Sequence, residues 1–223
     1  MKKAMILCVM FVMAIMANAQ VKELKKSGIS AEEMLPEGWT LLASAADDIN
    51  HDNIPDLVLV ALPDNPENIV TREDGYVKNM NEPVVAVYFG SGGVYQWWGS
   101  SIVIIEPESE FSSLDEITVS ITAKGVLNIG YKMFYSAGGW DVPSHKFVYR
   151  YQKDNLYLIG YDCKSFNRAT FEEQTVSYNF LTHKKQTVTK KDGAKKGREK
   201  WEKIANEELL EFGDSPLEYI GKF

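Results

Sequence analysis

An aspartate-rich segment, residues 47–56, is the part of this 223-residue sequence whose residue types and spacing best suit a defined chemistry. Oxygen-bearing side chains recur there at alternate positions. Calcium takes six to eight oxygen ligands at about 2.3–2.6 Å, and a tightly curled loop directs alternate side chains toward one centre. The sequence therefore predicts a calcium site with side-chain oxygens from Asp48, Asn50 and Asp52, the backbone carbonyl of Ile54, and the carboxylate of Asp56 directly or through water.

Two positions distinguish this segment from an EF-hand. Asn53 occupies the sharp-turn position that glycine usually holds, and asparagine tolerates left-handed backbone better than most residues. The twelfth position is Leu59, where an EF-hand has a bidentate glutamate, so a complete EF-hand is disfavoured. The competing interpretation is a solvated turn that binds nothing. We favour calcium, because neighbouring carboxylates repel one another unless a cation neutralises them.

The Asp-x-Asn-x-Asp-x-x-x-Asp pattern, followed by the Leu-Val-rich run 57–60, resembles the calcium loops of FG-GAP (integrin-α-like, VCBS-type) repeat proteins. It is also similar to single-copy loops in uncharacterised exported bacterial proteins. The resemblance covers only the loop and the run after it, and it implies that the loop binds a calcium ion. A whole β-propeller is not implied, because the pattern occurs once and no Phe-Gly pair opens it before Asp47.

The N-terminus has the three parts of a signal peptide. Lys2 and Lys3 precede an apolar run from Ala4 to Met16, and Ala17-Asn18-Ala19 offers the small residues of a cleavage site. We predict removal of residues 1–19 and a single β-rich domain over residues 20–223. The apolar run is shorter than the ~20 residues that span a bilayer, so no membrane anchor is expected. The predicted location is the periplasm, the cell surface or the medium.

Charge and cysteine content narrow the possible partners. The full chain has 24 basic and 31 acidic residues, and losing Lys2 and Lys3 leaves 22 against 31, a formal charge of −9. This balance argues against nucleic acid or an anionic membrane as the main partner, because both require a basic surface. Without Cys8, Cys163 is the only cysteine, so neither an intramolecular disulfide nor a cysteine-based zinc cluster is expected.

Short apolar runs separated by turn residues predict a mainly β fold, an antiparallel meander or sandwich. Ser30 and Glu33 have capping-box spacing for a short N-terminal helix before Pro36. Residues 63–83 are expected to form a long surface loop, and the apolar spacing over Ala194–Phe212 predicts a C-terminal helix. The predicted strands are 39–43, 57–62, 84–89, 94–98, 102–106, 117–123, 126–135, 146–151, 156–162, 175–181 and 186–189.

Other candidate residues carry weaker signals. Trp97, Trp98 and Trp140 could stack on sugars, although adjacent strand residues face opposite ways, so at most one of the pair is exposed. The three histidines lack metal-ligand spacing, and Cys163 is expected to be a small buried residue. The sequence thus favours an exported, non-catalytic calcium-binding protein whose partner is a glycan or another exported protein. The alternative is a carbohydrate-binding module or a glycan-active hydrolase that uses exposed aromatic residues.

Overall fold

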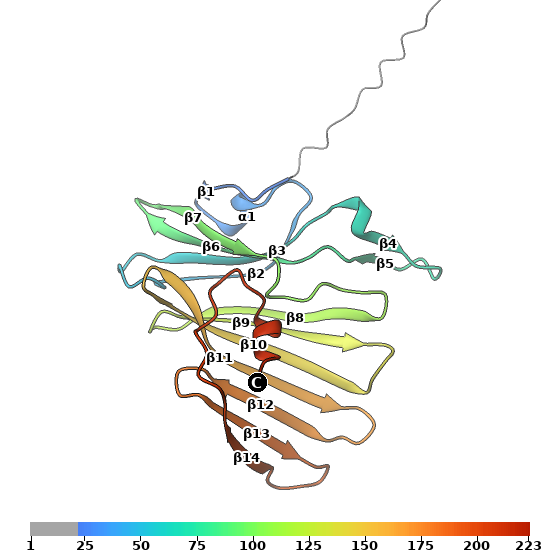
Figure 1. Cartoon of the computed structure of the whole chain (residues 1–223). Helices are drawn as coiled ribbons and strands as arrows, with labels where there is room; N and C mark the ends of the chain where they lie inside the picture. Colours follow the sequence, from blue (N-terminus) through green and yellow to red (C-terminus); the bar gives the residue numbers. More distant parts are fainter. Residues whose placement is uncertain (1–21) are drawn as a thin grey trace, which may run out of the picture.

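The computed structural model describes residues 22–223 and shows a mainly β protein built from antiparallel sheets (Figure 1). The predicted fold class, with a short helix near each end of the described chain, is confirmed. The predicted signal peptide, residues 1–19, lies outside the described residues. Within residues 22–223, no helix is both long and apolar enough to cross a membrane.

The first sheet has five strands, and β3, an interior strand of this sheet, is buried on both faces. Alternate residues of a strand face opposite ways, so Leu57 and Leu59 pack toward helix α1, whereas Val58 and Val60 pack toward the second sheet. A continuous apolar run is the pattern expected of such a strand. The strand order is β1 (Ser27–Gly28), β7 (Val94–Ser101), β6 (Val84–Ser91), β3 (Asp56–Leu62) and β2 (Thr40–Asp47).

Helix α1 (Ala31–Met34) forms where the capping residues predicted it. The Ser30 hydroxyl accepts the Glu33 N–H at 3.3 Å, and the Glu33 carboxylate accepts the Ile29 N–H at 2.9 Å. These bonds satisfy two backbone donors that would otherwise lack partners at a helix start. Met34 is fully buried and holds the helix against the outer face of the five-stranded sheet.

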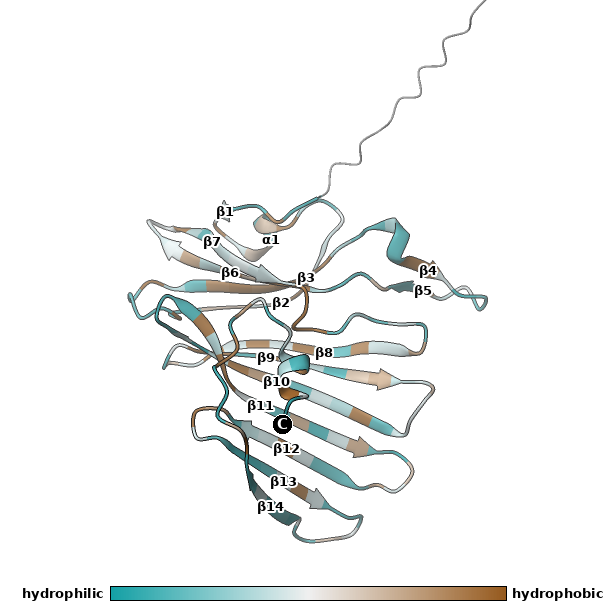
Figure 2. Ribbon diagram, in the orientation of Figure 1, coloured by the Kyte–Doolittle hydropathy of each residue, from teal (hydrophilic) through white to brown (hydrophobic). Residues whose placement is uncertain are grey.

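The second sheet is a seven-stranded antiparallel meander in which every strand pairs with its sequence neighbour. Hydrophobic and hydrophilic residues alternate along its strands, as Figure 2 shows. Ile117, Val119 and Ile121 share one face and pack against the core, as the period of two predicted. The strands are β8 (Ser112–Ile121), β9 (Val126–Tyr135), β10 (Asp141–Gln152), β11 (Asn155–Asn167), β12 (Glu173–Asn179), β13 (Lys184–Lys190) and β14 (Arg198–Lys203).

The main hydrophobic core lies between the two sheets. Val58, Val60 and Val87 from the first sheet meet Phe147 and residues of neighbouring strands from the second. Strand β2 lies against β8, so the two sheets are also joined along an edge. Strand β2, which leads into the aspartate-rich loop, therefore lies where the two sheets meet.

The expectation of a plain loop over residues 63–83 is wrong. The segment contains a 3-10 helix, η1 (Pro66–Asn68), and a small hairpin of β4 (Ile69–Thr71) and β5 (Val77–Asn79) that projects from the body (Figure 1). Buried Lys78 anchors the hairpin by donating to the Ser109 carbonyl at 2.7 Å. The anchor is distant in sequence, so the local proline and glycine content could not reveal it.

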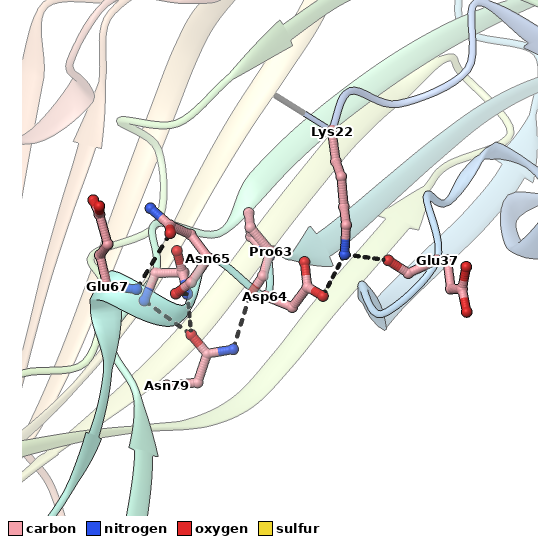
Figure 3. Close-up of polar contacts among 8 residues, drawn as sticks. Lys22, Glu37, Pro63, Asp64, Asn65, Glu67 and Asn79 are labelled. Atoms are coloured by element: carbon pink, nitrogen blue, oxygen red, sulfur yellow. Dashed lines mark hydrogen bonds and ion pairs between the residues drawn. The ribbon is translucent and has the colours of Figure 1, made fainter. Parts of the chain in front are cut away.

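Polar contacts connect the base of this segment within itself and to the N-terminal residues before β2 (Figure 3). The Asn79 amide donates to the Pro63 carbonyl at 2.8 Å. Lys22 donates to the Glu37 carbonyl at 2.8 Å and pairs with Asp64 at 2.6 Å. Both partners of that ion pair are partly exposed, so it contributes at most about 1 kcal/mol. The contacts therefore position the segment more than they stabilise the fold.

The predicted strand over residues 102–106 is also wrong. Ile104 and Ile105 are both buried, although they are consecutive and a strand would direct them to opposite faces. The chain passes here from β7 to β8, between the two sheets, without pairing to a neighbouring strand. Apolar composition correctly indicated burial at this point, but not the backbone conformation.

The predicted helix over Ala194–Phe212 is wrong as well. Residues 198–203 form β14, which pairs with β13 along its length, and Trp201 is exposed. The chain after β14 then crosses the core face of the second sheet in extended form, where Leu158 N–H donates to the Leu210 carbonyl at 2.9 Å. The C-terminal helix is the short α2 (Pro216–Ile220), capped by the Ser215 hydroxyl. The pairing of β14 with β13 outweighed the helical spacing of the apolar residues in this segment.

Candidate metal centre

The aspartate-rich loop connects β2 to β3, and its ends are held together because Asp47 and Asp56 are paired across the two strands. Ile49 is fully buried in the main core, which fixes the first half of the loop. Residues 51–55 are exposed. The loop is therefore anchored at three points while its polar tip faces solvent.

The predicted side-chain ligands all fold back onto the loop backbone. The Asp48 carboxylate accepts the N–H groups of His51 at 2.7 Å and Asn53 at 3.0 Å. Asn50 Oδ1 accepts the Asp52 N–H at 2.9 Å, and Asp52 Oδ1 accepts the Ile54 N–H at 2.8 Å. The loop thus curls tightly around the side chains at alternate positions.

Two residues of the loop adopt left-handed backbone: His51 with a φ of 67° and Asn53 with a φ of 64°. The prediction for Asn53 is confirmed, and asparagine has a smaller steric cost there than most residues. These two reversals allow five consecutive residues to turn within a short distance. The local sequence therefore explains the tight curl of the tip.

Asp56 has a different environment from the other acidic residues, because it is completely buried. One oxygen accepts the N–H groups of Ile49 at 2.9 Å and Asn50 at 3.3 Å, and the other accepts the Gly90 N–H at 2.9 Å. Asp56 thus ties the start of the loop to β6. The sequence predicted it as a metal ligand and offered no signal for this bond to β6.

The loop also packs closely against a strand of one sheet and a turn of the other. A Cβ on Gly90, in β6, would collide with the Pro55 carbonyl oxygen. A Cβ on Gly125, in the β8–β9 turn, would lie 3.0 Å from the Ile49 carbonyl oxygen and 2.7 Å from the His51 ring. Only glycine permits both approaches. The loop therefore sits where the five-stranded and seven-stranded sheets meet.

The electrostatics of the loop are dominated by unneutralised carboxylates. None of Asp47, Asp48, Asp52 and Asp56 takes part in an ion pair within residues 22–223. Burial raises the pKa of Asp56, its backbone hydrogen bonds oppose that shift, and the nearby negative charge of Asp52 adds to it. The ionised form of Asp56 is thus less stable in the folded protein than in water, which a nearby cation would correct.

The predicted donors are brought together only in part. Asp48, Asn50 and Asp52 lie on one curled tip, and Ile54 ends that tip. Asp56 is separated from them by its backbone bonds, and no three Asp, Glu, His or Cys side chains of the described chain converge as a metal cluster. A carboxylate has further lone pairs besides those that accept a backbone N–H. The oxygens at the tip therefore keep lone pairs that the backbone donors do not use.

The aromatic candidates divide as the strand geometry predicted. Trp98 packs in the main core against Phe89, with ring centroids 5.5 Å apart, whereas Trp97 faces outward and Lys26 lies 3.6 Å from its ring centroid. Trp140, in the β9–β10 connection, is 62% exposed. Trp140 is thus the more open of the candidate stacking surfaces.

One buried polar cluster was not predicted. On neighbouring strands β9, β10 and β11, Tyr131, His145 and Cys163 lie opposite one another. His145 Nδ1 is 2.7 Å from the Tyr161 hydroxyl, and the Tyr131 hydroxyl donates to Glu106 at 3.0 Å. Burial raises the pKa of the Cys163 thiol, which is opposite to the shift that activates a nucleophile. The signal available in sequence was the alternation of His145 with buried Phe147 and Tyr149.

We expect His145 to make stability depend on pH. Burial lowers the pKa of His145, and the charge of Glu106 only partly opposes that shift. The unfolded chain, with an ordinary histidine pKa of 6.5, therefore binds a proton before the folded protein does, and stability falls as the pH drops below about 6.5. Urea unfolding should show His145→Phe losing less stability than the parent protein between pH 7.5 and pH 5. Identical pH dependence of the two proteins would contradict this.

Comparison with known proteins adds no identification. No protein-family model matches the chain, and no curated protein or solved structure gives a match.

Proposed function

We propose that this chain is an exported, non-catalytic calcium-binding protein whose ion binds at the loop of residues 47–56. The observation that carries the proposal is the curl of the loop around Asp48, which accepts the N–H groups of both His51 and Asn53. The curl keeps the side chains of Asp48, Asn50 and Asp52 on one short loop, whose residues 51–55 are exposed. Calcium accepts irregular sets of six to eight such oxygens and completes them with water.

Charge supports a cation as the ligand. The tip has two carboxylates, Asp47 and Asp56 lie beside it, and none of the four has a cationic partner in the described part of the chain. The bond of Asn50 Nδ2 to Asp52 at 3.1 Å provides only a neutral donor. A divalent ion would therefore relieve repulsion that no cationic side chain within residues 22–223 relieves.

The proposed role of the ion is structural. It would hold a loop that contacts β6 of one sheet at Gly90 and the β8–β9 turn of the other at Gly125. It would also fix the start of β3, the doubly buried strand of the five-stranded sheet. A ligand that binds only the native state stabilises it by mass action. In this proposal, calcium stabilises the junction of the two sheets after the protein has left the cytosol.

Calcium should raise the stability of the mature chain from Gln20 onward. A dissociation constant of about 10⁻⁴ to 10⁻³ M, the range of extracellular modules, gives about 1.4–2.7 kcal/mol at ~10 mM calcium. The double variant Asp48→Asn/Asp52→Asn should lose this gain, because two charged ligands become neutral. Asp154→Asn/Asp192→Asn removes the same charge from other turns and should keep it. Calorimetric titration with calcium provides the measurement, and a parent protein with neither heat nor a shift in melting temperature would remove the proposal.

A further inference from the structure

A groove of about 770 Å³ lies on the face of the seven-stranded sheet that points away from the main core. It spans β8 to β12 near the end of the sheet that carries the β9–β10 and β11–β12 connections. Core residues such as Phe147 alternate with the residues that line it. We call it the outer-face groove; it includes Lys132, Phe134, Ser144, Lys164, Phe166 and Thr175.

Strand register arranges these side chains in two adjacent rows. In the first row, Lys132 lies opposite Ser144, Ser144 opposite Lys164, and Lys164 opposite Thr175. In the second row, Val142 lies opposite Phe166, and Phe166 opposite Glu173. The groove thus offers cations and hydroxyls beside an apolar strip.

Arg168 joins the groove to the exposed indole of Trp140. Its guanidinium carbon lies 4.7 Å from the ring centroid of Phe134 and 5.8 Å from that of Trp140. The guanidinium donates to the carbonyls of Tyr135 at 2.8 Å, Gly139 at 3.1 Å and Trp140 at 3.4 Å. Because all three bonds are to neutral carbonyls, they fix the orientation of Arg168 and leave its charge uncompensated.

The balance of charge in the groove is positive. Lys132 is paired with Asp115 at 3.6 Å, and Glu173 is paired with Lys190 at 3.6 Å. Lys164 and Arg168 take part in no ion pair within residues 22–223. The mature chain is strongly acidic overall, so two unpaired cations in one groove favour an anionic ligand.

We propose that the outer-face groove binds a glycan that carries carboxylates, such as a chain of uronic acids. The apolar faces of Phe134, Phe166 and Trp140 suit the C–H face of a pyranose ring. Small hydroxyl side chains, Ser144 and Thr175 among them, suit the sugar hydroxyls, and Lys164 and Arg168 suit the carboxylate. The site is distinct from the calcium loop, because β9 begins beside Gly125 and reaches the groove only near its other end.

The test compares two soluble probes, tetragalacturonate and the same oligomer with its carboxylates methyl-esterified. Titration calorimetry in buffer that contains a calcium chelator avoids binding of calcium by the probe itself, and it keeps the result independent of the calcium proposal. We expect tetragalacturonate to bind at least about tenfold more tightly than its ester, because only the charged form forms charge-assisted bonds to Lys164 and Arg168.

Two variants with matched controls locate the site. Lys164→Gln should weaken binding about tenfold, whereas Lys184→Gln, about 13 Å along β13 from the partner of Thr175, should not. Trp140→Ala should weaken binding about fivefold, whereas Trp201→Ala removes a similarly exposed indole from β14 without effect. All four positions are exposed, so folding should survive each change.

Three results would overturn the proposal. The first is no heat with either probe at about 10 mM, which corresponds to binding weaker than ~3 kcal/mol. The second is equal affinity for the acid and its ester, which would remove the role of the cations. The third is equal loss in the groove variants and their controls, which would place binding elsewhere.

Discussion

Asp56→Ala should lower the free energy of unfolding by about 4 kcal/mol even without calcium, because several buried groups lose their partner together. The carboxylate accepts backbone N–H groups from Ile49, Asn50 and Gly90, and it has no exposed surface. Alanine leaves these donors unsatisfied inside the protein, and each such group costs about 1–3 kcal/mol. Urea unfolding in a calcium chelator measures the change.

Two further variants test whether the buried carboxylate of Asp56 is the cause of this loss of stability. Asp52→Ala removes an exposed carboxylate whose Oδ1 accepts a single backbone N–H, from Ile54, so without calcium it should cost only about 1 kcal/mol. Asp56→Asn keeps the shape but turns an amide N–H₂ toward backbone donors, so it should be nearly as damaging as alanine. If Asp56→Ala cost no more than Asp52→Ala, the buried carboxylate would not be holding the loop to β6.

Gly90→Ala should destabilise the protein by about 3 kcal/mol or more, because the added methyl group has no space. Its Cβ would collide with the Pro55 carbonyl oxygen and lie 2.7 Å from Cγ2 of Ile54. The obstacle is backbone on the loop side, so relief requires the loop to move away from β6. That movement would also stretch the bond from the Gly90 N–H to Asp56. Thermal unfolding should show a drop of about 6–12 °C.

Gly99→Ala is the matched control for this substitution. Gly99 lies in β7, the strand paired with β6, and no atom stands within 4 Å of the position that its Cβ would take. Gly99→Ala therefore makes the same change in strand preference as Gly90→Ala but causes no collision. Its effect on the free energy of unfolding should stay below about 1 kcal/mol. Equal melting temperatures for the two variants would show that the loop does not rest against Gly90.

Both substitutions act on the loop through neighbours that are distant in sequence, and they separate fold from ligand. Asp56→Ala and Gly90→Ala should lower stability in chelator as well as in calcium. Asp48→Asn/Asp52→Asn should chiefly abolish the additional stability that calcium provides. If all three variants changed stability in the same way in chelator and in calcium, the loop would have only a structural role and calcium would make no separate contribution to stability.

Local chemistry determined much of the fold. The period of two in β8, the glycine pair of the β6–β7 turn and the capping residues around α1 each produced the expected element. The reversals at Asn53 and the alternate oxygens of the loop likewise follow from a few neighbouring residues. Such features depend on preferences that act within a few residues, so one sequence is enough to reveal them.

Three elements required the tertiary structure. Residues 198–203 pair with β13 as a strand, although the spacing over Ala194–Phe212 predicted a helix. Residues 63–83 contain a hairpin that Lys78 anchors to acceptors near β8. Ile104 and Ile105 were buried together by the crossing between the sheets. In each case, contacts outside the segment outweighed its local preference, and such contacts leave no periodic pattern in the segment's own sequence.

The aspartate-rich loop shows the same division within ten residues. The ten residues alone are enough to predict which side chains curl inward and that the segment joins two strands. The burial of Asp56 against Gly90 depends on contacts across the fold, as does the groove shared by lysine, arginine and aromatic side chains from β9 to the β11–β12 connection. The physical reason is that strand register, set by contacts over the whole sheet, determines which distant side chains become neighbours.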